Sequence, residues 1–224
     1  MKKVEDADIL LHFIKFSISN LRKYQDAIES FLQKEKDILD KSYNKGLLEI
    51  KQNDKKSYNK LAFEYYKKSG DIVKTFPNNF RSSFLIQIIS FVEHELKTIC
   101  SHNEIVKKTK YSIDDLKGNN DIIKAKIFLE KSCNIDFFEL GKEWNFIINC
   151  KRIRNKFVHY QGLAKKNEKE WKILNDFNNK KQYYYFSPNS DLTEESKLII
   201  QSRRFIDNLL DVIELFFNNL LTQE

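Results

Sequence analysis

The sequence predicts an all-α fold, because its composition disfavours the other fold classes. Its 224 residues include five Gly and two Pro, whereas β-sandwiches and barrels need many tight turns built from these residues. Hydrophobic residues make up 41% of the chain, with 18 Phe and 10 Tyr, which is enough for a substantial core. Apolar residues also recur at helical spacing along most of the chain. We therefore expect a helical bundle.

Residues 5–35 are expected to form the first helix, because their apolar residues follow the spacing of a helix face. These residues are Ile9, Phe13, Phe16, Leu21, Tyr24, Ile28, Phe31 and Leu32. Residues 36–69 continue in a more polar register. They extend the same helix or form a second one after a break near Gly46 or Asn53.

Gly70 and Pro77 are expected to mark a boundary, because both residue types interrupt helices. This boundary divides the chain into two parts. Residues 1–77 are expected to form an N-terminal helical hairpin or extension. Residues 78–224 are expected to form the main helical domain.

The main domain is expected to be built on a central helix at residues 80–101. This stretch is apolar on nearly every side from Phe84 to Val92, as in a helix that lies within a core. Residues 112–115 are expected to start a short helix, which Gly118 breaks. Residues 120–132 are expected to form another helix.

The last third of the chain is expected to hold two long helices, at residues 137–160 and at about 192–221. The second carries a capping pattern at its start, Asp191-Leu-Thr-Glu194. Between them, residues 163–182 are polar and basic, and Tyr183–Phe186 is the only plausible strand. The sequence thus predicts a bundle with an N-terminal helical extension and a small irregular insert before the last helix.

Positive charge gathers around the end of the first of these helices. Residues 141–183 hold eleven Lys or Arg against four Asp or Glu, which accounts for about the whole formal charge of +7. A basic zone of this kind favours an anionic partner such as RNA. The alternative is that the charge has no specific meaning, since the chain is rich in Lys, Asn and Ile, as in proteins from AT-rich genomes.

The cysteines do not indicate a metal site. Cys100, Cys133 and Cys150 are far apart, and no Cys-x-x-Cys pattern occurs, so we expect reduced, buried thiols, no metal and no cofactor. The charged N-terminus lacks a signal-peptide pattern, and no run of ~18 uncharged apolar residues occurs. A cytoplasmic protein without a membrane partner is therefore expected.

The stretch Lys151–Tyr160 carries the residues best suited to chemistry. An arginine such as Arg154 binds a phosphate through its planar fork of donors, and His159 titrates near neutral pH and can transfer a proton. These two functions suffice for attack by a ribose 2′-OH on its own phosphate, without a metal ion. Asn155 is expected to position one of the two groups. The expected ligands of the flanking phosphates are Lys151, Arg152 and Lys156.

Arg154 and His159 are five positions apart, which is about 140° around an ideal helix. Arg152, Asn155 and His159 share a face more closely. One Arg and one His are few groups for this reaction, which benefits from an acid, a base and charge stabilisation. A symmetric dimer with its two-fold axis beside the motif supplies two of each.

With this motif, the chain resembles the HEPN superfamily, all-helical domains that include toxin, phage-defence and RNA-targeting CRISPR ribonucleases. The resemblance rests on Arg154-Asn155-x3-His159 in a late helix, preceded by an apolar helix that carries Glu93, and it spans residues 78–222. It implies a metal-independent endoribonuclease whose Arg-x4–6-His centres meet in a homodimer. It also implies that Glu93 supplies the polar residue of the earlier helix, with His94 as the competing candidate.

The resemblance further implies a toxin or defence effector with an antitoxin or another defence-system protein as partner. Family toxins that pair with a nucleotidyltransferase often have a tyrosine two residues after the histidine. Here Tyr160 follows His159 directly and position 161 is Gln, so that particular pairing is not expected.

Other readings of the same residues remain open. One alternative is that His159 is a helix C-terminal residue stabilised by the helix dipole, and that Arg154 forms a structural ion pair with Glu93 or Glu95. These readings fit a non-catalytic HEPN-like module that binds RNA or protein, or a structural helical dimerisation protein. Tyr183–Tyr185 can stack on bases or pack as a strand.

Overall fold

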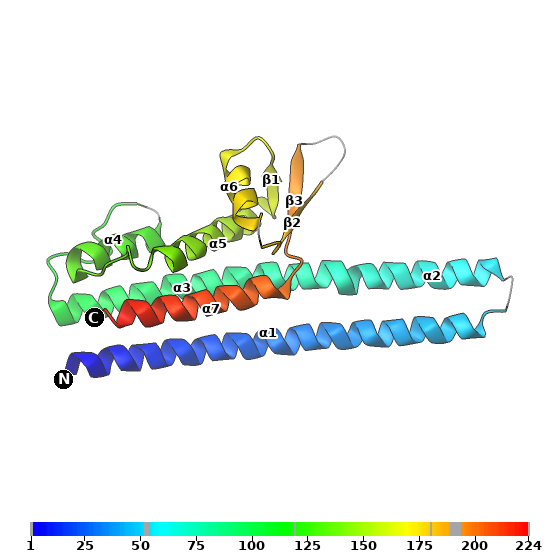
Figure 1. The fold of residues 1–224 in the computed structure, drawn as a ribbon, viewed down its shortest axis with the longest axis horizontal. Coiled ribbons are helices and arrows are strands. Elements are labelled where there is room, and N and C mark those ends of the chain that lie inside the picture. The colour runs from blue at the N-terminus through cyan, green and yellow to red at the C-terminus, as the bar shows by residue number, and fades with distance from the viewer. Residues whose placement is uncertain (1, 52–53, 119, 180, 189–193, 224) are drawn as a thin grey trace.

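The computed structural model describes residues 2–51, 54–118, 120–179, 181–188 and 194–223. It is mostly helical, which confirms the all-α expectation in its coarse form, and it adds a small three-stranded sheet (Figure 1). Within the described part of the chain, the helices are too short or too polar to cross a membrane.

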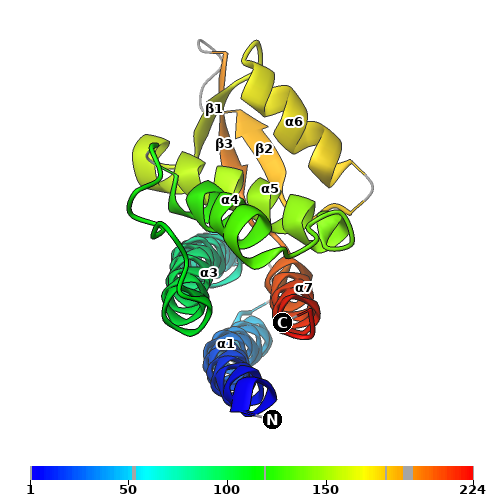
Figure 2. The ribbon, with the colours of Figure 1, turned by 90° about the vertical axis from the view of Figure 1, so that its left-hand side faces the viewer.

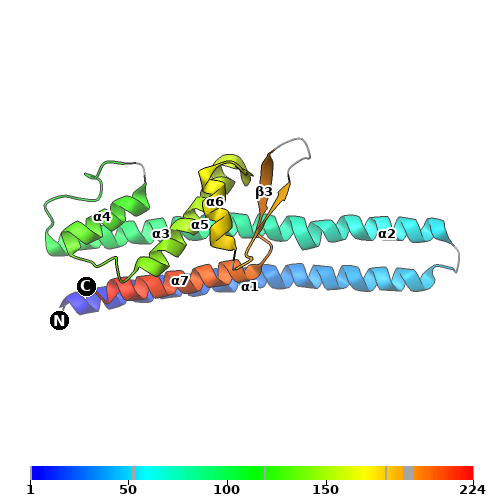
Figure 3. The ribbon, with the colours of Figure 1, turned by 45° about the horizontal axis from the view of Figure 1, so that its top comes forward.

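Two antiparallel helical rods give the molecule its length (Figures 1 and 3). The break expected near Gly46 or Asn53 lies between these rods, after α1 ends at Glu49, and residues 52–53 are outside the described residues. The first rod is α1 (Lys2–Glu49), and the second joins α2 (Lys55–Gly70), the π-helical turn η1 (Asp71–Thr75) and α3 (Phe76–Lys107).

The expectation that Gly70 and Pro77 interrupt the helical structure is wrong, because the chain stays helical through both residues. A proline inside a helix removes one backbone hydrogen bond and crowds the preceding turn. Here the wider π turn η1 lies immediately before the first turn of α3, which contains Pro77. The division of the chain at residue 77 stays a prediction.

The bundle has three layers (Figure 2). Its middle layer is α3 beside α7 (Arg203–Leu221), with α1 packed on one side of this pair. On the other side lie α4 (Asp121–Cys133) and α5 (Gly141–Tyr160). The segment Phe84–Val92 of α3 contributes Phe84, Leu85, Ile88, Ile89 and Val92 to the buried core, which confirms its expected central place.

The N-terminal half of α1 is part of this bundle. Ile14 and Ile18 are almost fully buried in the core, and Arg81 Nε of α3 donates a 2.7 Å hydrogen bond to Glu29 Oε1. Further along, the end of α1 from residue 36 to Glu49 and the whole of α2 form an arm of two helices that projects beyond the core (Figure 1). In this arm, Tyr65 Oη donates a 2.8 Å hydrogen bond to Asp40 Oδ1.

The insert before the last helix is regular, which corrects the expectation of irregular structure. Its three strands pair antiparallel in the order β1-β3-β2, and the expected strand at Tyr183–Phe186 is shifted by two residues. The elements of the insert are β1 (Leu163–Lys165), α6 (Lys169–Asn178), β2 (Tyr185–Pro188) and β3 (Glu195–Ile199). The sequence missed β1 and β3 because each is short and weakly patterned.

The last helix begins later than expected, at Arg203 instead of about residue 192. Ser202 is its N-cap, and its side chain accepts a hydrogen bond from Arg204 N. The apolar run before it resembles a helix face, but Leu198 and Ile199 of this run pair with β2. Of the expected capping pattern at 191–194, only Glu194 lies within the described residues.

Two smaller expectations are also wrong. Residues 112–115 form a turn instead of a helix, because the Asp115 carboxylate accepts hydrogen bonds from both Ser112 N and Ser112 Oγ. The helix expected from Phe137 begins at Gly141. The residues before it form a turn in which Phe138 N donates to Asp136 Oδ1.

Candidate functional site

The motif lies in the C-terminal half of α5, which packs on α3 and α7. The buried face of α5 includes Trp144, Ile147, Cys150 and Ile153, so the helix is held rigidly against the core. Gln161 ends it in the left-handed conformation, with φ at 53°. Gly162 follows at φ 82°, a conformation that glycine adopts at low cost, and its N–H donates to Lys156 O at 2.9 Å.

Glu93 of α3 lies between two cations of α5. Its Oε1 accepts a 2.6 Å hydrogen bond from Lys151 Nζ, and its Oε2 lies 3.8 Å from Arg154 Nη2. The Lys151 ammonium also donates to Asn120 Oδ1 at 2.9 Å. All three charged side chains are mostly buried, with 12–22% of each exposed, so this small cluster carries a net positive charge at a partly desolvated position.

Arg154 has more donors than partners. Nη1 donates to Asn155 Oδ1 at 3.1 Å, but the Glu93 carboxylate is beyond hydrogen-bonding distance. Nε is buried and has no hydrogen-bond partner among the described residues. A guanidinium has five N–H donors, and 20% of the side chain is exposed, so the Nη donors that Asn155 does not occupy are those that remain for an anion.

His159 lies in the last turn of α5, exposed to solvent, and its ring contacts the ring of Tyr160 edge-on at 6.3 Å. Among the described residues, no side chain hydrogen-bonds to its imidazole. The structure therefore brings together Arg154, Asn155 and Glu93, and it leaves His159 apart from them on an open surface.

The three basic residues expected to bind flanking phosphates are in different surroundings. Arg152 Nη1 donates to Asn149 Oδ1 at 3.0 Å, and no carboxylate of the described chain pairs with it. Lys151 is held by Glu93, as described above. Only Arg152 has a charge that is not already paired with an acidic side chain.

Lys156 joins the insert to α5. Only 4% of the residue is exposed, and Nζ lies 2.9 Å from Glu168 Oε2 and 3.4 Å from Glu170 Oε2. Burial by itself would lower the pKa of Lys156, but the hydrogen bond to Glu168 and the two negative charges outweigh it and raise that pKa. The same hydrogen bond lowers the pKa of Glu168. These contacts favour a structural role for Lys156.

Three residues of this region were missed by sequence reasoning: Asn120, Glu168 and Glu170. Asn120 caps α4 by accepting a hydrogen bond from Ile123 N, and it also contacts Lys151. A cap pattern at Asn120-Asp121 was available as a signal. Glu168 and Glu170 are two of the four acidic residues in the basic stretch 141–183, and a rare opposite charge there is a candidate ion-pair partner.

The remaining chemical candidates are mostly part of the core. Tyr183 and Tyr184 are buried, and Tyr184 Oη donates to Leu174 O at 2.6 Å, so of the three tyrosines only Tyr185 is exposed. Burial raises the pKa of the Cys150 thiol well above its ordinary value, which makes it a poor nucleophile. Within the described residues, no three His, Cys, Asp or Glu side chains group as a metal site would require.

Comparison of the chain with protein-family models, with curated proteins and with solved structures finds no match.

Proposed function

We propose that the protein is a metal-independent endoribonuclease that acts as a homodimer, in the manner of a toxin or a phage-defence effector. The observation that carries this proposal is the state of Arg154. It is positioned by Asn155 and by the rigid helix α5, yet most of its donors are unused at the edge of a positively charged cluster. Such a group is prepared to bind a phosphate.

In the proposed reaction, a ribose 2′-oxygen attacks the adjacent phosphorus. One imidazole takes the 2′-OH proton, the P–O5′ bond breaks, and a second imidazole returns a proton to the departing 5′-oxygen. The products are a 2′,3′-cyclic phosphate and a 5′-OH end. The Arg154 guanidinium stabilises the negative charge that the phosphorane develops.

A single chain supplies one His159, and this residue does not contact Arg154. The proposal therefore needs a second copy, which brings its own motif to the same cleft across a two-fold axis. The exposure of His159 supports this step, because a residue of a composite site must be accessible in the isolated chain.

Glu93 has a positioning role in this proposal. It neutralises Lys151 and stays 3.8 Å from Arg154, close enough to attract the guanidinium without occupying it. A bound phosphate competes well for Arg154 at that distance. We propose Arg152 as the ligand of a neighbouring phosphate, and we assign the paired cations Lys151 and Lys156 to the structure of the site and of the insert.

A second function is a module that binds RNA or a protein without cleaving RNA. The isolation of His159 in the single chain favours it, since no acid or base partner lies within hydrogen-bonding reach in the described residues. This alternative predicts RNA binding that His159→Ala leaves unchanged, and no cleavage.

The test is incubation of total tRNA and a structured single-stranded RNA with the purified protein in EDTA. We expect cleavage by the wild type and loss of at least ~10²-fold in rate in His159→Ala, the range attributed to general acid–base catalysis. His102→Ala, on α3 and far from the motif in sequence, is the matched control and should cleave at the wild-type rate. Equal cleavage by His159→Ala would exclude the proposed chemistry.

A further inference from the structure

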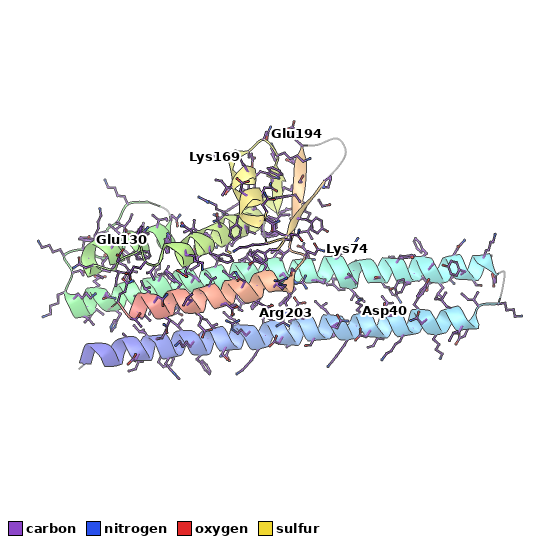
Figure 4. All side chains as sticks on the ribbon, viewed as in Figure 1. Asp40, Lys74, Glu130, Lys169, Glu194 and Arg203 are labelled. Atoms are coloured by element: carbon purple, nitrogen blue, oxygen red, sulfur yellow. The ribbon has the colours of Figure 1, made fainter. Side chains whose placement is uncertain are left out.

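Helix α1 has two apolar faces, and the bundle covers one of them. Ile14, Ile18 and Leu32 face the core and are buried. Side chains also project along the opposite side of α1, away from α3 and α7 (Figure 4). The large apolar side chains that remain 48–62% exposed on α1 are Ile9, Phe13, Phe16, Tyr24, Phe31 and Ile38. Of these, Tyr24 lies at the edge of the covered face, because its ring also packs edge-on against Phe80 and Phe84 of α3.

These six residues form one continuous stripe, here called the α1 seam. With 100° per residue, they fall within an arc of about 80°, together with Asn20, Ala27 and Lys34. The successive positions differ by three or four residues throughout, from Ile9 to Ile38. This is the spacing with which helices pack along a shared seam in coiled coils.

The exposed area of the seam is large enough for a specific interface. A large apolar side chain presents about 200 Å², and roughly half of each is exposed, so the six contribute about 600 Å² per chain. That is the upper end of the apolar patch that monomeric proteins usually expose. Two such faces in contact bury about 1,200 Å², which reaches the range of stable protein interfaces.

The order of residues along the seam identifies the partner. Eight of its positions are symmetric about a midpoint that lies between Lys23 and Tyr24. In order from the N-terminus, positions 9, 13, 16 and 20 correspond to positions 38, 34, 31 and 27. Two copies of α1 running antiparallel through that midpoint therefore match. The matched pairs are Ile9 with Ile38, Phe16 with Phe31, Asn20 with Ala27 and Phe13 with Lys34. A two-fold symmetric interface requires this self-complementarity.

The chemistry of the mirrored pairs also favours the antiparallel arrangement. It places the Lys34 ammonium and its alkyl chain over the Phe13 ring, a favourable cation–π geometry. On the flank it places His12 opposite Glu35. A parallel pair would instead put Lys34 beside its own copy and Glu35 beside its own copy, which is repulsive.

We propose that the α1 seam binds the seam of a second copy of this chain in antiparallel orientation. Helix α1, which carries the seam, and the motif helix α5 lie on opposite sides of the α3–α7 layer (Figure 2). This interface is therefore separate from the one that forms the composite site, and it does not rest on the proposed function. A chain with both interfaces assembles beyond a dimer.

The first experiment measures molar mass by light scattering for the wild type and for Phe16→Glu/Phe31→Glu. Both side chains face solvent in the single chain, so we expect the variant to keep its helical circular dichroism and to halve the assembly mass. Ile105→Glu/Phe138→Glu, at two exposed apolar positions outside the seam, is the control and should keep the wild-type mass. An unchanged mass in the seam variant overturns the proposal.

The second experiment tests the register by disulfide formation under mild oxidation. The double variant Asn20→Cys/Ala27→Cys should form covalent dimers, because these positions face each other only in the antiparallel pair. Neither single variant should form them. Covalent dimers in each single variant would show a parallel pair, and no covalent dimer in the double variant would also overturn the proposal.

Discussion

Arg152 and Lys156 lie four positions apart on α5, yet the structure gives their charges different roles. The Arg152 guanidinium contacts an amide, whereas the Lys156 ammonium is buried against two carboxylates and lies 4.8 Å from the centre of the Tyr160 ring. An unpaired cation at a surface can bind phosphate. A buried, paired cation stabilises the elements that it joins.

We predict that alanine substitution separates these roles. Arg152→Ala should weaken RNA binding and reduce the slope of log affinity against log salt by about 1, with the melting temperature unchanged. Lys156→Ala should lower the free energy of unfolding by about 2 kcal/mol, through lost charged hydrogen bonds. Its salt slope should stay that of the wild type. Salt-dependent binding and thermal unfolding measure the two effects, and a reduced salt slope in Lys156→Ala would contradict the assignment.

At the scale of elements, the contact between the insert and α5 is expected to depend on pH. The pKa of Glu168 is lowered, chiefly by its hydrogen bond with Lys156, so this carboxylate stabilises the fold at pH values above its ordinary pKa near 4.5. The contribution is lost as the pH falls through the lowered pKa of the folded state. The Lys156 pKa is raised, so its contribution is lost only at strongly basic pH.

Glu168→Gln removes the acid-sensitive half of this contact. We predict that it lowers the melting temperature at pH 7, and that the difference from the wild type shrinks as the pH falls below about 4. Glu139→Gln, at an exposed position without an ion pair among the described residues, is the control and should track the wild type at every pH. A melting-temperature difference between Glu168→Gln and the wild type that stays constant down to pH 2 would show that the charge of Glu168 does not stabilise the fold.

Helices were predictable from this sequence where the apolar periodicity was long, whereas of the three strands only β2 was expected, two residues out of place. The continuous apolar stretch of α3 places it in the core without further information, because a helix that is apolar on nearly every side has to be buried. In β3, by contrast, Leu198 and Ile199 pair with Phe186 and Tyr185 of β2, and the start of β3 pairs with the more distant β1. Local pattern does not contain that pairing, so the last helix was expected about ten residues too early.

The candidate site was predictable in its residue types and less so in its contacts. The spacing of Arg154 and His159 already implied that they lie about 140° apart, and in the structure they do not contact each other. That Glu93 pairs more closely with Lys151 than with Arg154 depends on how α5 lies against α3. Such a contact between distant helices requires the tertiary structure.

At the scale of the whole molecule, the account predicts a site shared between two chains. Arg154→Ala and His159→Ala should each be inactive as homodimers. When the two variants are coexpressed, about half of the randomly formed dimers hold one intact Arg154 and one intact His159 in the same cleft. We expect the mixture to regain part of the wild-type cleavage rate. A mixture no more active than its two components would contradict a shared cleft in which one guanidinium and one imidazole suffice for partial activity.

The chemistry of the new RNA ends shows whether the ribose 2′-oxygen is the attacking group. A defined RNA is cleaved in EDTA by the wild-type protein, and mass spectrometry identifies the new ends. Attack by the 2′-oxygen predicts 2′,3′-cyclic phosphate and 5′-OH ends without any divalent metal. Ends with 3′-OH and 5′-phosphate would exclude attack by the 2′-oxygen, and cleavage that appears only after Mg²⁺ is added would exclude a metal-independent reaction.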